Sequence, residues 1–174
     1  DTFVQYVVEL GGVRLIALDS LLPGMMQGRL CAERLKWLEE RLGENSSAPT
    51  IIMLHHPPVA VGIPAMDGPA LEGSETFGDI VSKFDNVERI VAGHVHCHVQ
   101  RRYHGTIVLT CPSTALQSYI DPSHRETYCG ILSTPSCLLH HWSEETRLVT
   151  YTCPIEPAGD VLPVHDGKQW IPFD

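Results

Sequence analysis

The stretch Thr50–Leu54 constrains the fold of this 174-residue chain most, because it is a short, almost wholly apolar run followed at once by histidines. Strands of this kind are typically buried on both faces, as in parallel sheets. Leu30–Leu42 before it has the apolar spacing of a helix, and Ser74 after it is placed to cap a second helix. Another strand follows at Glu88–Ala92. This order of elements predicts right-handed crossovers and a largely parallel sheet.

The flanking segments predict further strands. Phe3–Leu10 and Val13–Asp19 are rich in strand-forming residues, and Gly11-Gly12 between them is typical of a two-residue hairpin turn. The first helix should end at Gly43. Residues 1–153 should form the folded portion, and the proline-rich residues 154–174 an irregular tail. Downstream of the histidines we expect four strands that pair antiparallel: Val99–Tyr103, Thr106–Thr110, Cys137–Trp142 and Arg147–Cys153.

Composition excludes several classes of protein. The formal charge of −9 and the pI near 5.5 argue against nucleic-acid binding, which depends on clustered Lys and Arg. No apolar run approaches the roughly 18 to 20 residues that span a bilayer, so we expect a soluble protein with no membrane partner. The six scattered cysteines contain no C-x-x-C pair and indicate reduced thiols. These features favour a cytoplasmic location.

Two histidine clusters begin where the two central strands should end. His55-His56-Pro57-Pro58 follows Leu54, and Gly93-His94-Val95-His96 follows Ala92. The carboxyl edge of a parallel sheet is where ligands bind, so neighbouring strands would bring both clusters to one site. In an extended backbone the two histidines of H-x-H lie on the same side, about 6.6 Å apart. That spacing suits two metals roughly 3.5 to 4 Å apart.

Two-metal hydrolase sites also need anionic ligands, and the sequence offers few. Asp19 ends a strand and is the only Asp placed like a ligand. A lone His-His pair is more often a polar surface pair than a ligand pair. His140 and His141 lie in an alternating strand, which favours a packed histidine over a ligand. Arg101-Arg102 could steer an anionic substrate, although a solvated strand end is the more common role.

The run I-I-M-L-H-H-P-P (Ile51–Pro58), followed by A-G-H-V-H (Ala92–His96), resembles the last two metal motifs of the calcineurin-like metallophosphoesterases. Four further segments resemble the bacterial class III cyclic nucleotide phosphodiesterase and glycerophosphodiesterase branch: V-R-L-I-A-L-D-S, G-R-L, L-x-W-L-E and P-S-T-A-L-Q. The resemblance runs from about Asp1 to His141. It implies an α/β fold, a mixed β-sheet sandwich flanked by helices within a four-layer αββα arrangement.

The resemblance also implies roles for individual residues. His55 and His94 would bind one divalent metal and His96 a second, the metals being Mn, Fe, Zn or Co. His56 would be no ligand but would form a hydrogen bond beside the site, on the substrate side. Asp19 falls where the family uses no ligand and should be structural. The family's upstream motifs D-x-H and G-N-H are absent from this chain, and G-D occurs only as the dipeptides Gly78-Asp79 and Gly159-Asp160, neither of which follows a predicted strand. The upstream motifs would supply the bridging carboxylate and the leaving-group histidine, so the catalytic residues stay unassigned.

Two functions follow as alternatives. The first is a dinuclear metal-dependent hydrolase of small phosphodiesters, of the cyclic nucleotide or glycerophosphodiester type, present here as a C-terminal portion that should be nearly inactive alone. The second is a non-catalytic metal-binding or scaffold module derived from the same fold. A chain that starts within a sheet should also expose apolar surface, so we expect a homo-oligomer or pairing with the missing N-terminal portion.

Overall fold

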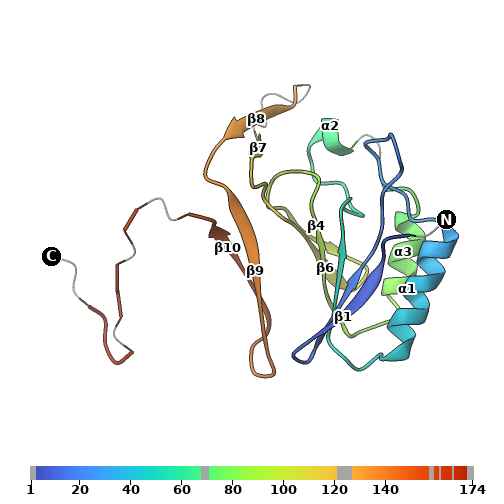
Figure 1. Ribbon diagram of the computed structural model, residues 1–174, viewed down its shortest axis with the longest axis horizontal. Helices are drawn as coiled ribbons and strands as arrows, with labels where there is room; N and C mark the ends of the chain where they lie inside the picture. Colours follow the sequence, from blue (N-terminus) through green and yellow to red (C-terminus); the bar gives the residue numbers. More distant parts are fainter. Residues whose placement is uncertain are drawn as a thin grey trace.

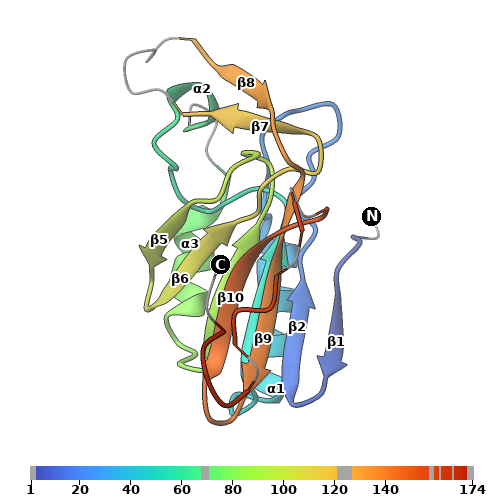
Figure 2. The same cartoon turned by 90° about the vertical axis from the view of Figure 1, so that its left-hand side faces the viewer.

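A six-stranded mixed sheet organises the computed structural model, which describes residues 3–67, 71–120, 127–156, 159–160, 162–165 and 167–171. The strand order is β1-β2-β3-β4-β6-β5 (Figures 1 and 2). The strands are β1 (Tyr6–Leu10), β2 (Val13–Ala17), β3 (Thr50–Leu54), β4 (Val87–Ala92), β5 (Gln100–Tyr103) and β6 (Thr106–Thr110).

The pairing of these strands matches the sequence prediction in its centre and at both edges. β1 and β2 form the expected antiparallel hairpin around Gly11-Gly12. β2, β3, β4 and β6 run parallel to one another. β5 is antiparallel to β6 and closes the opposite edge. The carboxyl ends of β3 and β4 are therefore adjacent, as the two strand-then-histidine junctions required.

Within the described ranges, three helices accompany the sheet: α1 (Ala32–Glu44), the single turn α2 (Pro64–Asp67) and α3 (Ser74–Val81). α1 and α3 cover one face of the sheet (Figure 1). Two predicted boundaries were wrong. α1 continues through Gly43 to Glu44, and Ser74 is the first residue of α3 rather than its cap. The cap is Gly73, whose φ of 88° and close approach to the carbonyl oxygen of Leu30 leave no room for a side chain.

The core lies between the sheet and these two helices. Ile52 and Leu54 of β3 point into it, whereas Met53 faces the opposite side and is 37% exposed. Ile51, on the same face as Met53, is buried at 9% exposure, so the prediction that β3 is buried on both faces holds except at Met53. The core also contains Ile16, Leu18, Leu30, Leu35, Leu38, Leu42, Leu71, Phe77, Ile80, Val81, Val87, Ile90, Ala92 and Val108.

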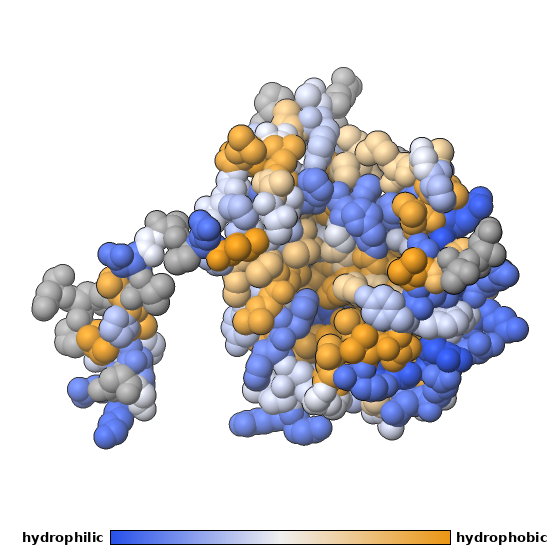
Figure 3. All heavy atoms as spheres, viewed as in Figure 1, coloured by the Kyte–Doolittle hydropathy of each residue, from blue (hydrophilic) through white to orange (hydrophobic). Residues whose placement is uncertain are grey.

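The other face of the sheet looks onto a two-stranded ribbon formed by β9 (Ser136–Ser143) and β10 (Arg147–Pro154). Leu148 and Trp142 of this ribbon pack on Val13 and Ile51, forming a small second cluster. Between ribbon and sheet lies an apolar groove of about 890 Å³. Figure 3 shows apolar residues gathered in this middle part of the visible face. The second layer of the expected sandwich is thus represented by the ribbon.

Two features lie outside the predicted elements. β7 (Leu116–Tyr119) and β8 (Cys129–Leu132) form a second antiparallel ribbon that the sequence patterns did not reveal. Beyond Pro154, the described residues contain one isolated bridge, between His165 and Trp170. The division of the chain at residue 153 remains a prediction. All six cysteines are unpaired, as expected. In the described part of the chain, no helix has the length and apolar composition needed to cross a membrane.

Candidate metal centre

His55 and His94 lie side by side because they follow two neighbouring parallel strands, β3 and β4. Their ring centroids are 5.2 Å apart. The backbone N–H of Gly93 donates to the carbonyl oxygen of His55 at 3.0 Å, which fixes the two loops to each other. Ligand-capable nitrogens of His55, His56 and His94 all lie within 4.8 Å of one another. The sheet edge thus brings His94 of the second cluster beside both histidines of the first, as the sequence predicted, whereas His96 is not part of this group.

The loop that carries His94 and His96 is bent rather than extended. Both residues have left-handed backbone torsions, with φ of 69° for His94 and 50° for His96. Val95 between them is fully buried, and its N–H donates to the carbonyl of Gly93 at 2.8 Å. The extended-backbone argument for the H-x-H spacing was therefore wrong. Gly93 itself is outside the left-handed region, so the positive φ values fall on the two histidines.

His56 differs from the other histidines of the cluster because both of its ring nitrogens have partners. Nε2 lies 3.1 Å from the carbonyl oxygen of Met26, which can only accept, so this nitrogen carries the proton and donates. Nδ1 lies 2.9 Å from the hydroxyl of Ser20, which donates to it. The same hydroxyl accepts the backbone N–H of His56 at 3.3 Å. With both nitrogens engaged, the ring has no lone pair left for a metal.

Sequence reasoning missed the residues that hold His56. Ser20 lies just past the end of β2, the third parallel strand, so the carboxyl-edge rule applied to β2 could have found it. Gly28 leaves space for the imidazole, since a Cβ there would lie 2.4 Å from Nδ1 of His56. This glycine belongs to the G-R-L segment, and its contact with His56 follows only from tertiary packing.

Burial and mutual repulsion keep the histidine cluster neutral. Burial lowers the pKa of His55, and the nearby His96 lowers it further. For His94, burial, His55 and His96 lower the pKa in that order. Burial, His55 and His94 lower the pKa of His56 to about 4, against a small opposing effect of the Met26 carbonyl. Neutral imidazoles expose the lone pairs that metals bind. Among the described residues, the rings of His55 and His94 have no hydrogen-bond partner.

The donor set fits a divalent metal in part. Neutral imidazole nitrogens suit Zn, Fe, Mn or Co. Within the described residues, no carboxylate joins the histidine group. Asp19 has other partners: it accepts the N–H groups of Val4 and Leu21 at 3.2 and 2.8 Å and lies 3.4 Å from the guanidinium of Arg34. These contacts give Asp19 a structural role. The anionic part of a two-metal site is therefore not found in the described part of this chain.

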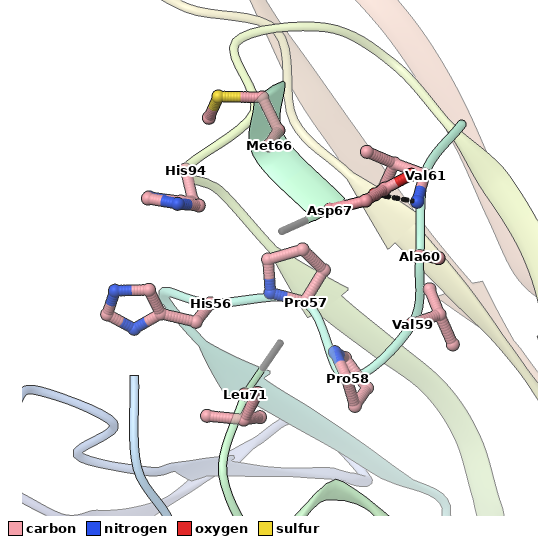
Figure 4. Close-up of a pocket in the computed structure, with 10 residues that line it drawn as sticks. All are labelled: His56, Pro57, Pro58, Val59, Ala60, Val61, Met66, Asp67, Leu71 and His94. Carbon is pink, nitrogen blue, oxygen red and sulfur yellow. Dashed lines mark hydrogen bonds between the residues drawn. The ribbon is translucent and has the colours of Figure 1, made fainter. Parts of the chain in front are cut away.

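A small pocket of about 60 Å³ lies beside the cluster (Figure 4). The side chains of His56 and His94 project to the same side of it from two neighbouring segments. Asp67 holds the loop that forms its far wall, accepting the N–H groups of Val61 and Gly62 at 2.6 and 2.8 Å. This carboxylate is thus used to shape the pocket. The pocket gives His56 and His94 one common wall next to the candidate site.

The remaining polar candidates lie apart from the cluster or have structural partners. His140 faces the groove, and its Nδ1 lies 2.9 Å from the hydroxyl of Thr150 on the neighbouring strand. His141 points away from the sheet and is exposed. Arg101 donates to the carbonyl of Ala60 at 2.7 Å. These contacts favour packing over metal binding for His140, and loop support over substrate steering for Arg101.

Comparison with known proteins gives clear relatives. No protein-family model matches the chain. The "probable glycerophosphodiester phosphodiesterase GpdQ" of Arcobacter nitrofigilis is 34% identical over 169 residues, which cover 97% of this chain and 62% of that protein. A "probable cyclic nucleotide phosphodiesterase" of Synechococcus sp. is 41% identical over 111 residues, 64% of this chain and 43% of that protein. The chain thus spans less than two thirds of these relatives.

The fold has a counterpart among solved structures. A dimetal phosphatase from Danio rerio superposes with a TM-score of 0.53 at 13% identity, over 63% of this chain and 49% of that one. At this identity the likeness concerns the fold alone. Together, the similarity to curated phosphodiesterases along nearly the whole chain and the shared mixed α/β fold place this chain with the calcineurin-like metallophosphoesterases, as the counterpart of their C-terminal portion.

Proposed function

We propose that this chain is part of a dinuclear metal-dependent hydrolase of small phosphodiesters. The observation that carries the proposal is the pairing of His55 and His94 at the ends of adjacent parallel strands, with neutral rings and free nitrogens. The relatives named as glycerophosphodiester and cyclic nucleotide phosphodiesterases support this reaction class. Both substrate types contain a phosphodiester between small organic groups.

In this proposal His55 and His94 hold one metal and His96 the second. When bound, Mn, Fe, Zn or Co would supply the Lewis acidity that activates water and neutralises charge on the phosphoryl oxygens. The chain's own task is positioning. The Gly93–His55 backbone bond holds the two loops together, and burial keeps the imidazoles unprotonated near neutral pH. That His56 contacts the substrate stays a prediction; its two hydrogen bonds favour support of the neighbouring histidines.

The protein surface has little to attract a phosphodiester by itself. The net charge is −9, so the general field of the chain repels an anion. A metal-loaded histidine cluster would therefore be the main local attraction for the phosphate. This arrangement suits small soluble substrates better than polyanions such as nucleic acids, which need extended basic surfaces.

The alternative is a non-catalytic metal-binding or scaffold module. The observation that supports it is that no carboxylate joins the histidine group within the described residues. The imidazoles of His55, His94 and His96 bring no negative charge, so they cannot offset the repulsion between two dications a few ångströms apart. We therefore propose that the 174-residue chain alone holds at most one metal and is nearly inactive, whichever alternative describes the longer protein.

The open face of the sheet indicates where another segment or a second copy of the chain would pack. Apolar side chains of β2, β3 and β4 line the groove of about 890 Å³ opposite the helices. We propose that this face is covered by the part of the relatives' length that the chain does not span, or by a second copy when that part is absent. We also propose a cytoplasmic location, since six unpaired cysteines suit a reducing compartment.

The test is an assay of the full-length protein on a bis-aryl phosphate, with each of the four metals added in turn. His94→Ala and His96→Ala should each remove most turnover. The matched control is His141→Ala, which removes an exposed imidazole from the outer side of the β9–β10 ribbon and should retain full activity. Full activity of both site variants would refute the assignment. Metal binding without turnover in the unaltered protein would favour the non-catalytic module.

A further inference from the structure

The loop carrying His94 and His96 is held by two buried hydroxyl groups from later in the chain. Left-handed torsions are unfavourable for residues with a side chain and persist only where neighbouring contacts impose them. In this loop they are adopted by both candidate ligands, His94 with a φ of 69° and His96 with a φ of 50°. The loop between β4 and β5 must therefore be fixed by groups outside it.

Ser118 of β7 makes the closest set of contacts with this loop. Its backbone N–H donates to the carbonyl of His96 at 2.9 Å, and its hydroxyl donates to the carbonyl of Val95 at 2.6 Å. The Ser118 hydroxyl has a single proton, so the phenol of Tyr128, 2.8 Å away, must donate to it. Ser118 is 7% exposed. Ser118 thus binds the two peptide carbonyls that flank His96, those of Val95 and of His96 itself.

Thr110 of β6 fixes the stretch that follows the histidines. Its hydroxyl donates to the carbonyl of Cys97 at 2.6 Å and accepts the N–H of Val99 at 2.9 Å. The side chain is 1% exposed, so water does not replace these bonds. Thr110 therefore holds the backbone of Cys97 and Val99 after the histidines, whereas Ser118 holds the peptide carbonyls of Val95 and His96.

We infer that Ser118 is a positioning residue that orients the imidazoles of His94 and His96 for metal binding, with Thr110 in a secondary role. The inference rests on the proposed function in one respect, that these histidines are metal ligands. Groups that orient ligands from behind typically affect metal affinity about 10- to 100-fold. Ser118→Ala should weaken binding within that range, because the carbonyl of Val95 loses its hydroxyl donor, whereas the backbone bond to the His96 carbonyl is kept and the cavity created is small.

The chain provides a matched control for lost hydroxyls. Thr50 is fully buried, and its hydroxyl donates to the carbonyl of Ala48 at 2.9 Å and accepts a bond from Asn86 at 3.2 Å. It therefore resembles Thr110 in burial and in bonds, but it lies at the amino end of β3, the opposite edge of the sheet. Thr50→Val and Thr110→Val remove equivalent groups from the two edges.

The experiment titrates Zn²⁺ alone into the 174-residue chain by calorimetry, beside thermal unfolding and backbone amide exchange of the metal-free protein. Ser118→Ala should lower Zn²⁺ affinity about 10- to 100-fold, and Thr110→Val should lower it by less. Thr50→Val should leave affinity unchanged although its unfolding temperature falls at least as far. Ser118→Thr retains the hydroxyl and should restore most of the affinity. In metal-free Ser118→Ala, the Val95 amide should exchange faster than in Thr50→Val.

The outcomes separate this inference from the proposed function. If His94→Ala binds Zn²⁺ as tightly as the unaltered chain, the ligand assignment fails, and if the unaltered chain binds no Zn²⁺, the titration tests neither claim. In either case amide exchange alone decides whether Ser118 holds the loop. If His94→Ala binds weakly while Ser118→Ala binds like Thr50→Val, the ligands stand and the positioning role of Ser118 is refuted.

Discussion

The hydroxyl of Ser20 lies 2.9 Å from Nδ1 of His56, joining the ends of β2 and β3 at the sheet edge where the other histidines lie. Both residues are buried, at 2% and 6% exposure. The Met26 carbonyl can only accept, so Nε2 of His56 carries the proton and the Ser20 hydroxyl donates to Nδ1. A contact between a serine and a histidine 36 residues apart thus satisfies the second nitrogen of the ring beside the candidate ligands.

Removal of that hydroxyl should destabilise the fold. Ser20→Ala leaves the buried Nδ1 of His56 without a donor, and unsatisfied buried polar groups cost about 1–3 kcal/mol. Urea unfolding of the 174-residue chain would measure the loss. Ser82→Ala is the control, since its hydroxyl donates a single exposed bond to the carbonyl of Asp79, and it should change stability by under about 0.5 kcal/mol. Equal stability of the two variants would contradict the role given to Ser20.

A methyl group at position 28 should displace His56. In Gly28→Ala the added carbon would lie 2.4 Å from Nδ1 of His56, so the ring or the loop must move, and overpacking of this kind costs about 1–3 kcal/mol. Gly43→Ala places the same methyl in helix α1 with no atom within 4 Å and should stabilise the chain by about 0.5–1 kcal/mol. Unfolding midpoints should therefore move in opposite directions. A harmless Gly28→Ala would show that His56 is not tightly packed.

Stability should fall as the pH drops from about 6.5 to about 4. His56 has a folded-state pKa lowered to about 4 from an ordinary 6.5, chiefly by burial. Across this window the unfolded chain binds a proton that the native state does not, so acid favours unfolding; above about 6.5 the effect vanishes. Thermal unfolding measured against pH should show this decline, and His56→Gln should flatten part of it. An identical decline in the variant would mean that His56 is not responsible.

The 174-residue chain alone should bind no more than one divalent metal. The candidate ligands His55, His94 and His96 carry no negative charge, and within the described residues no carboxylate joins the group of His55, His56 and His94. Calorimetric titration with Zn²⁺ or Mn²⁺ should give a stoichiometry of one or less, and His55→Ala should reduce it further. Two tightly bound metals per chain would reveal carboxylate ligands in this polypeptide, and Asp19 would then be the first residue to substitute.

The open sheet face should cause self-association of the isolated chain. Met53 lines the apolar groove and is 37% exposed, so Met53→Lys would place a charge where a second copy would pack. Light scattering should detect a dimer or larger species that Met53→Lys shifts toward monomer. Met25→Lys changes a more exposed methionine that does not line the groove and should leave association unchanged. A monomeric unaltered chain would rule out this use of the groove.

Local patterns in the sequence determined the central elements and the place of the site. The apolar run before His55, the run before His94 and the amphipathic spacing of α1 each reflect burial of one segment's own side chains, so they can be recognised without knowledge of the fold. The carboxyl-edge rule then placed both histidine clusters together, because parallel neighbouring strands end on the same side. These inferences needed only periodicity and strand order.

Tertiary structure alone decided how the histidines are held. The left-handed torsions of His94 and His96, the bond from Ser20 to His56 and the anchoring by Ser118 depend on residues distant in the sequence. Gly73 caps α3 in place of Ser74 for the same reason, since the carbonyl of Leu30 lies against it. Propensity describes what a segment favours by itself, whereas these conformations are unfavourable locally and are maintained by contacts that form only when the chain has folded.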